Sequence, residues 1–232
     1  MTASPARHPI ALAALAVAAA LAAAACSASG SSPTPAPTSS QTAAPAAACP
    51  TSAPPPFTSN EKATVTLDTT QGQIVIAVDG SLAPHAIANF VALARCGMYD
   101  QTIFHRIVPD FVIQGGDVLW GKQPIFNWPR VGTGGPGYTI PDDPVTAPYQ
   151  RGVVAMARTS KPNSQGSQFF IVLDDEAAGS LSKANTYAIM GSVVEGMDVV
   201  DAIAKTPTTT DGRNAPIGDS PPTITKVTVS GP

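Results

Sequence analysis

Short stretches of alternating polar and apolar residues, separated by glycine- and proline-rich segments, are the feature that most limits the folds open to this chain. The clearest pair covers residues 63–68 and 73–78, with Gln71-Gly72 between them. Alternation with period two places the apolar side chains on one face of a strand. The pair therefore predicts a β-hairpin.

Further β-rich runs follow the hairpin, and only two segments have helical spacing. The first helix is expected at residues 84–96, between Pro84 and the stop at Gly97, and the second at 197–204. Many short strands with two helices favour an antiparallel barrel over a βαβ sheet. The other strands are expected at residues 102–108, 111–114, 152–158, 167–173, 187–193 and 223–229.

The N-terminus has the composition of an export signal. Arg7 and His8 precede an apolar run from Ile10 to Ala25, which is shorter than the roughly 20 residues that span a bilayer. An uncleaved membrane anchor is the alternative. The run ends at Cys26 and resembles a bacterial lipobox, in which the cysteine carries the lipid. We expect an exported protein, held on the outer face of the cell membrane as a lipoprotein or secreted.

The chain divides into three parts by composition: a signal peptide at 1–25, a tether at 26–59 and a globular domain at 60–232. The tether is rich in Ser, Thr, Ala and Pro and has no hydrophobic periodicity. Cys49 in the tether and Cys96 in the domain are a possible disulfide, because an exported protein reaches an oxidising compartment. Two unpaired thiols are the alternative.

Several function classes are excluded by what the sequence lacks. A net charge of −3, with only 12% charged residues and no basic stripe, argues against a nucleic-acid partner. The three histidines have no metal-ligand spacing, so no metal and no cofactor are expected. Residues 132–137 match G-x-G-x-x-G but lack the strand and helix that a dinucleotide site needs, and they predict a surface loop.

The remaining candidates for functional residues lie in two segments, residues 104–117 and 166–171. They read Phe-His-Arg-Ile-Val-Pro-Asp-Phe-Val-Ile-Gln-Gly-Gly-Asp and Gly-Ser-Gln-Phe-Phe-Ile, and both closely resemble the cyclophilin signature. The resemblance covers residues 63–230. It implies a mainly β fold, a closed eight-stranded antiparallel barrel capped by two α-helices, and peptidyl-prolyl cis/trans isomerase activity.

The resemblance also assigns the site residues. Arg106 is the expected catalytic residue, although a solvated ion pair with Asp117 or Asp110 is its structural alternative. Phe104, Phe169 and Ile171 are expected in the core. The substrate-binding residues are expected to be Phe111, Val112, Gln114, Gly132, Ala157, Arg158, Gln168, Phe170, Leu181 and Tyr187.

The chain departs from the family pattern at several positions. Val112 replaces a usual methionine, Arg158 a common asparagine and Tyr187 a frequent histidine. No tryptophan lies between Leu173 and Tyr187, so binding of cyclosporin A is expected to be weak. Residues 118–131 form a longer insert than usual, whose role the sequence does not define.

An arginine, two glutamines and apolar side chains suit rotation about a peptide bond, which breaks no covalent bond. The barrier to that rotation is about 18–20 kcal/mol, and the imide before proline is its target. We expect a monomer that isomerises X-Pro bonds in exported polypeptides. The alternatives are a non-catalytic proline-peptide-binding or chaperone module and, in a third class, a stalked adhesin.

The lipobox interpretation predicts that Cys26→Ser yields a protein without lipid. The reason is that the thiol of Cys26 is the atom to which the lipid is joined. Mass spectrometry of the mature N-terminus tests this, with the Cys49→Ser variant as a control that should keep the lipid. A mature wild-type chain that begins elsewhere than at a lipidated Cys26 would contradict the interpretation.

Overall fold

The computed structural model describes residues 47–124 and 127–231. The predicted signal at 1–25, the lipidation site Cys26 and the first part of the predicted tether lie outside the described residues. Within the two described ranges, no helix has the length and apolar character needed to cross a membrane.

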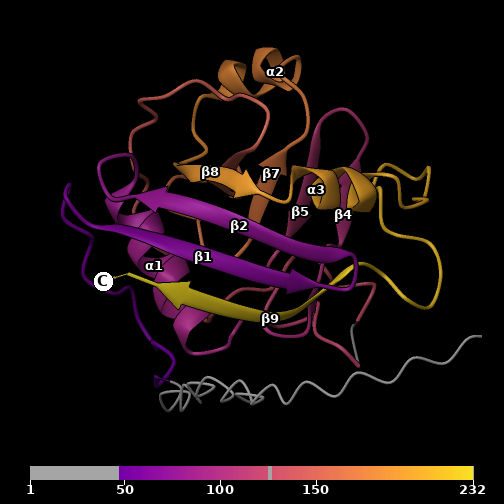
Figure 1. Cartoon of the computed structure of the whole chain (residues 1–232), viewed down its shortest axis with the longest axis horizontal. Helices are drawn as coiled ribbons and strands as arrows, with labels where there is room; N and C mark the ends of the chain where they lie inside the picture. The colour runs from indigo at the N-terminus through magenta and orange to yellow at the C-terminus, as the bar shows by residue number, and fades with distance from the viewer. Residues whose placement is uncertain (1–46, 125–126, 232) are drawn as a thin grey trace, which may run out of the picture. The chain divides into compact units, whose positions relative to one another are not determined.

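One antiparallel sheet of nine strands forms the framework of the domain (Figure 1). Its strand order is β3-β9-β1-β2-β8-β6-β7-β5-β4. The predicted hairpin is confirmed, because β1 pairs with β2 from Lys62↔Asp79 to Thr69↔Gly72. The strands are β1 (Lys62–Thr69), β2 (Gly72–Asp79), β3 (Thr102–Ile103), β4 (Arg106–Val108), β5 (Val112–Gly115), β6 (Val153–Met156), β7 (Phe169–Val172), β8 (Ile189–Glu195) and β9 (Thr223–Ser230).

The expected closed barrel of eight strands with two helices is wrong. The sheet is a curled half-barrel, and its two edge strands, β3 and β4, come from the single run predicted at 102–108. This run changes partner in its middle: the Phe104 amide donates to Pro222 O, and the His105 amide donates to Gln114 O. The strand therefore splits, with β3 paired to β9 and β4 paired to β5.

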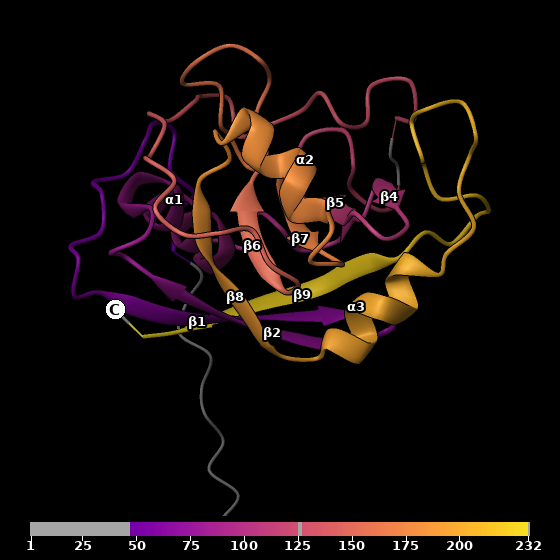
Figure 2. The ribbon, with the colours of Figure 1, turned by 90° about the horizontal axis from the view of Figure 1, so that it is seen from above.

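Three helices accompany the sheet: α1 (Pro84–Arg95), α2 (Ala177–Ala184) and α3 (Met197–Ala204). Figure 1 shows α1 behind β1 and β2, and Figure 2 shows α2 beside β6 and β7, away from β1. The carboxylate of Asp143 accepts the amides of His85 and Ala86, which satisfies two of the orphan donors in the first turn of α1. The helices α1 and α3 agree with the predicted segments, whereas α2 was not predicted.

The apolar side chains form two clusters on opposite faces of the central strands. Phe104, Phe169 and Ile171 belong to the main core, as expected. Val112 and Phe170 belong to a second, smaller cluster. Because strand side chains alternate, β5 and β7 contribute to both clusters at once.

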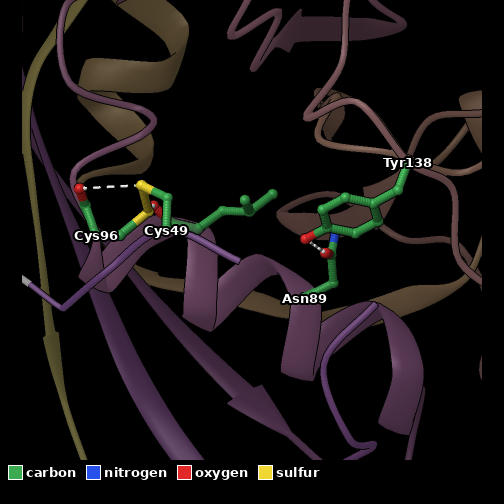
Figure 3. The surroundings of a disulfide bond; sticks show 5 residues. Cys49, Asn89, Cys96 and Tyr138 are labelled. Carbon is green, nitrogen blue, oxygen red and sulfur yellow. Dashed lines mark hydrogen bonds between the residues drawn. A yellow bond between two sulfur atoms is a disulfide. The ribbon is translucent and has the colours of Figure 1, made fainter. Parts of the chain in front are cut away.

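The last part of the predicted tether is held against the domain at two points. Cys49 and Cys96 form a disulfide bond, with their Cα atoms 5.0 Å apart, at the C-terminal end of α1 (Figure 3). Further along, Phe57 packs against the main core, and its amide donates to Pro84 O at 3.1 Å. The last part of the predicted tether is thus attached to the domain before β1 begins at Lys62.

Removal of the disulfide is expected to destabilise the domain. The bond closes a loop with a sequence separation of 47 residues, and in the chain-entropy model such a loop contributes about 4 kcal/mol by constraining the unfolded state. The double variant Cys49→Ala/Cys96→Ala should therefore unfold at a lower urea concentration than the wild type. Equal midpoints for the two proteins would show that the bond contributes no stability.

Candidate functional site

Arg106 lies on the edge strand β4, directly opposite Gln114 of β5. Its side chain is half-buried, and this burial lowers the pKa of the guanidinium, while the nearby Tyr187 acts in the opposite direction. Among the described residues, no carboxylate lies within the 4 Å of an ion pair with Arg106. The structural alternative for Arg106, an ion pair with Asp117 or Asp110, is therefore absent.

The second apolar cluster brings together the aromatic and aliphatic residues predicted for the site. Phe170 is central to it: its ring meets that of Tyr187 edge-on, with the centroids 5.4 Å apart. Val112 and Leu181 are buried, and Phe111 packs against them. The cluster is built from strands β5, β6, β7 and β8, helix α2 and the residues beside them, so its members come from distant parts of the sequence. The predicted residues that it contains are Phe111, Val112, Ala157, Phe170, Leu181 and Tyr187.

A chain of hydrogen bonds joins the two predicted amides to the glycine loop. Gln114 Nε2 donates to Gln168 Oε1 at 3.0 Å. Gln168 Nε2 in turn donates to Gly132 O at 3.0 Å and to Gly134 O at 2.9 Å. With both ends of its amide engaged, Gln168 is held in one orientation and fixes that of Gln114.

Asp117 binds the same glycine loop through backbone amides. Its carboxylate is fully buried and accepts the amides of Gly132 at 2.7 Å and Gly134 at 3.0 Å. It also accepts the amides of Leu119 and Trp120, at the start of the insert. A Cβ at position 134 would collide with this carboxylate, so the close approach requires glycine. The anchoring role of Asp117 was not predicted.

A hollow of about 520 Å³ lies beside the amides. Five predicted residues line it: Gln114, Gly132, Ala157, Arg158 and Gln168. The guanidinium of Arg158 joins two loops on either side of β6, because it donates to Asp142 at 2.8 Å and to Lys161 O at 2.8 Å, and only 8% of its side chain is exposed. Arg158 therefore shapes the wall of the hollow through an internal ion pair.

Two residues that support the site were missed at the level of sequence. Tyr149 is buried and hydrogen-bonds both the amide and the carbonyl of Tyr187, at 3.1 and 2.9 Å, so it fixes the backbone beside Phe170. His105, next to Arg106, is only 5% exposed. Neither of its ring nitrogens has a hydrogen-bond partner among the described residues, and burial lowers its pKa to about 4. No local pattern around Tyr149 indicates its role.

The arrangement combines a half-buried cation, two amides and an apolar surface. No cluster of three metal-binding side chains occurs in the part of the chain that the structure describes. An apolar surface suits a ring, and an exposed guanidinium edge suits a carbonyl or an electron pair. The groups are therefore placed to bind a peptide beside a ring and to stabilise a change in one of its amides.

A family model described as cyclophilin type peptidyl-prolyl cis-trans isomerase/CLD matches residues 64–229. A probable peptidyl-prolyl cis-trans isomerase of Brucella abortus (strain 2308) is 42% identical over 144 residues, which are 61% of this chain and 71% of that protein. Peptidyl-prolyl cis-trans isomerase B of Escherichia coli (strain K12) is 36% identical over 176 residues, or 72% of this chain and 99% of that protein.

Solved structures agree with these matches. A crystal structure of a cyclophilin type peptidyl-prolyl cis-trans isomerase of Cryptosporidium parvum superposes with a TM-score of 0.60 at 29% identity, covering 73% of this chain and 97% of that one. A second crystal structure of that protein, in the presence of the dipeptide Ala-Pro, has a TM-score of 0.60 at 30% identity, covering 72% and 98%.

The buried His105 predicts a loss of stability in mild acid. Its ring stays neutral in the folded state down to pH about 4, whereas an unfolded histidine takes up a proton near pH 6.5. Between these values the unfolded state binds more protons, so the free energy of unfolding falls as the pH falls. From about pH 7 to about pH 5 the loss due to His105 is about 2 kcal/mol.

Urea titrations at the two pH values test this prediction. The His105→Gln variant should lose about 2 kcal/mol less than the wild type between them, because glutamine does not titrate. An equal loss in both proteins would show that His105 does not carry the acid sensitivity.

Proposed function

The chain belongs to the cyclophilin-type peptidyl-prolyl cis-trans isomerase family, and from this we propose that it isomerises the X-Pro bonds of exported polypeptides at Arg106. The enzyme class rests on the family match over residues 64–229 and on relatives that bear the isomerase name. The observation that supports the assignment of the site is the position of Arg106, which lies opposite Gln114 on β5. Val112, on the same strand as Gln114, is a member of the apolar cluster.

The apolar cluster is the proposed proline pocket. Phe111, Val112, Phe170 and Leu181 would hold the pyrrolidine ring while the residue before it rotates. The ring is a rigid apolar body, so it can be gripped without a hydrogen bond. The amides of Gln114 and Gln168, together with the main chain near Ala157 and Arg158, would bind the peptide beside the ring.

Arg106 is the proposed catalytic residue. Conjugation of the imide nitrogen with the carbonyl is lost when the C–N bond twists, and the nitrogen then gains a free electron pair. A guanidinium that donates to this nitrogen stabilises the twisted state more than either planar isomer, which is the requirement for lowering the barrier. The partial burial of Arg106 strengthens such a contact, because less water competes for it.

The proposed place of action is the outer face of the cell membrane. The support is the apolar run that ends at Cys26, the tether at 26–59 and the disulfide between Cys49 and Cys96, which suits an oxidising compartment. A lipid on Cys26 would be the membrane attachment, with the domain acting as a monomer on nearby exported chains. The absence of a tryptophan between Leu173 and Tyr187 supports weak binding of cyclosporin A.

Arg106→Ala is expected to lower kcat by about 10²–10³, the cost of losing one transition-state donor in a comparable site. KM should change little, because the contact forms chiefly in the twisted state. Arg106→Lys should not restore the rate, since an ammonium lacks the planar fork of donors. A peptide isomerisation assay on the full-length protein measures each variant.

Phe111→Ala is the matched comparison, because it removes part of the proposed pocket and should raise KM as well. The thermal transition of each variant reports whether the fold is intact. If Arg106→Ala keeps the wild-type kcat with an unchanged transition, the catalytic assignment is wrong. The non-catalytic peptide-binding module would then describe the protein better.

A further inference from the structure

A second hollow, of about 270 Å³, opens next to Arg106. It shares Gln114 and Gly132 with the larger hollow, so the two are neighbours along the same surface. Its other walls include Trp128 from the insert and Arg213 from the loop between α3 and β9. None of the roles assigned above uses Trp128 or Arg213.

Both walls of this hollow are fixed to the framework. On one side, the carboxylate of Asp117 holds the Gly132 amide at 2.7 Å, and Arg130 lies over the ring of Trp120, 4.7 Å from its centroid. On the other side, the Ile107 amide of β4 donates to Asn214 O at 2.9 Å. The residue before Asn214 is Arg213, and both Arg213 and Arg106 line the hollow.

The charged residues that line the hollow are both cations. Arg106 and Arg213 line it, and the residues that line it include no carboxylate, although the whole chain has a net charge of −3. The Nε of Arg213 lies 3.4 Å from Asp211, but the two side chains are 70% and 50% exposed. An ion pair at such exposure is weak, so a second carboxylate can compete with Asp211 for Arg213.

His105 adds a polar group without a partner at the same place. A Cβ built on Gly132 would lie 3.7 Å from Nε2 of His105, so this nitrogen sits directly beneath a residue that lines the hollow. His105 is only 5% exposed, and both of its ring nitrogens lack a hydrogen-bond partner within the described part of the chain. His105 thus adds an unpaired polar side chain to the lining of the hollow.

We propose that this hollow is a subsite for an acidic side chain of the substrate polypeptide, close in sequence to the isomerised proline, with Arg213 as the residue that determines this specificity. The inference rests on the proposed function, because it requires that the proline occupy the neighbouring apolar cluster. The ligand chemistry follows from the two guanidinium groups, which bind carboxylates through charge-assisted hydrogen bonds. The insert then has a defined role: with Trp128 it supplies one wall of the subsite.

The test uses pairs of short peptides that differ only by Glu or Gln. The acidic residue is placed two positions before the proline in one pair, and one or two positions after it in two others. NMR exchange spectroscopy with the full-length protein measures both the isomerisation rate and the binding of each peptide. At one position the Glu peptide should have a kcat/KM about two- to fivefold higher than the Gln peptide, a preference that added salt should reduce.

Three variants separate a local contact from the overall charge of the protein. In Arg213→Gln, the kcat/KM of the Glu peptide divided by that of the Gln peptide should be close to one. In Asp211→Asn this ratio should increase, because the competing carboxylate is removed. Lys226→Gln changes the net charge as Arg213→Gln does, but on the exposed side of β9, and should leave the ratio as in the wild type.

Equal kcat/KM for the Glu and Gln peptides at all three positions would contradict the proposed subsite. A preference for Glu that Lys226→Gln removes as fully as Arg213→Gln would contradict it as well. The proposed function fails separately, if neither peptide of any pair is isomerised. In that case the binding measurement still decides the subsite: tighter binding of a Glu peptide that depends on Arg213 supports it, and equal binding contradicts it.

Discussion

The pairing of β5 with β7 is the interaction on which both the core and the site depend. Ile113 lies opposite Ile171, and these two side chains enter the main core. The next pair along the ladder, Gln114 opposite Phe170, points to the other face and carries an amide and a ring of the site. A slip of one residue in this register would exchange the two faces, placing a glutamine in the core and an isoleucine in the groove. The hydrophobic core therefore specifies the geometry of the site.

A buried carboxylate extends this order from the strands to the loops. Asp117 follows β5 by two residues and accepts hydrogen bonds from four backbone amides, two on each oxygen, which matches the roughly four lone-pair sites of a carboxylate. It accepts the amides of Gly132 and Gly134, whereas Gln168 donates to the carbonyl oxygens of the same two residues, so both side chains fix this loop. The polar half of the site is thus a continuous network, which is costly to disturb at any member because its groups are shielded from water.

Sequence periodicity predicted the hairpin, α1 and α3, because each has a regular apolar face. It did not predict α2, in which only Ala177 and Leu181 are buried and the rest of the helix is polar or small. The closed barrel, expected from the number of strands and from the resemblance, was wrong because neither specifies which strands pair, and the partner changes between Phe104 and His105. The site residues were predicted from the Arg106 motif. The engagement of Arg158 by Asp142, by contrast, depends on a loop fold that the sequence does not encode locally.

The disulfide at the end of α1 has a mechanical consequence. A pull on the chain from its N-terminal side reaches Cys49 and passes through the sulfur bridge to Cys96, because the covalent link is the shorter route. The hairpin of β1 and β2 and the helix α1 lie in the loop between these two cysteines, so they are excluded from the path of the force. The strands that carry the groove, from Arg106 onward, lie on the far side of Cys96. Tension therefore enters the domain at a single point, and the hairpin cannot be peeled from the sheet from its N-terminal end.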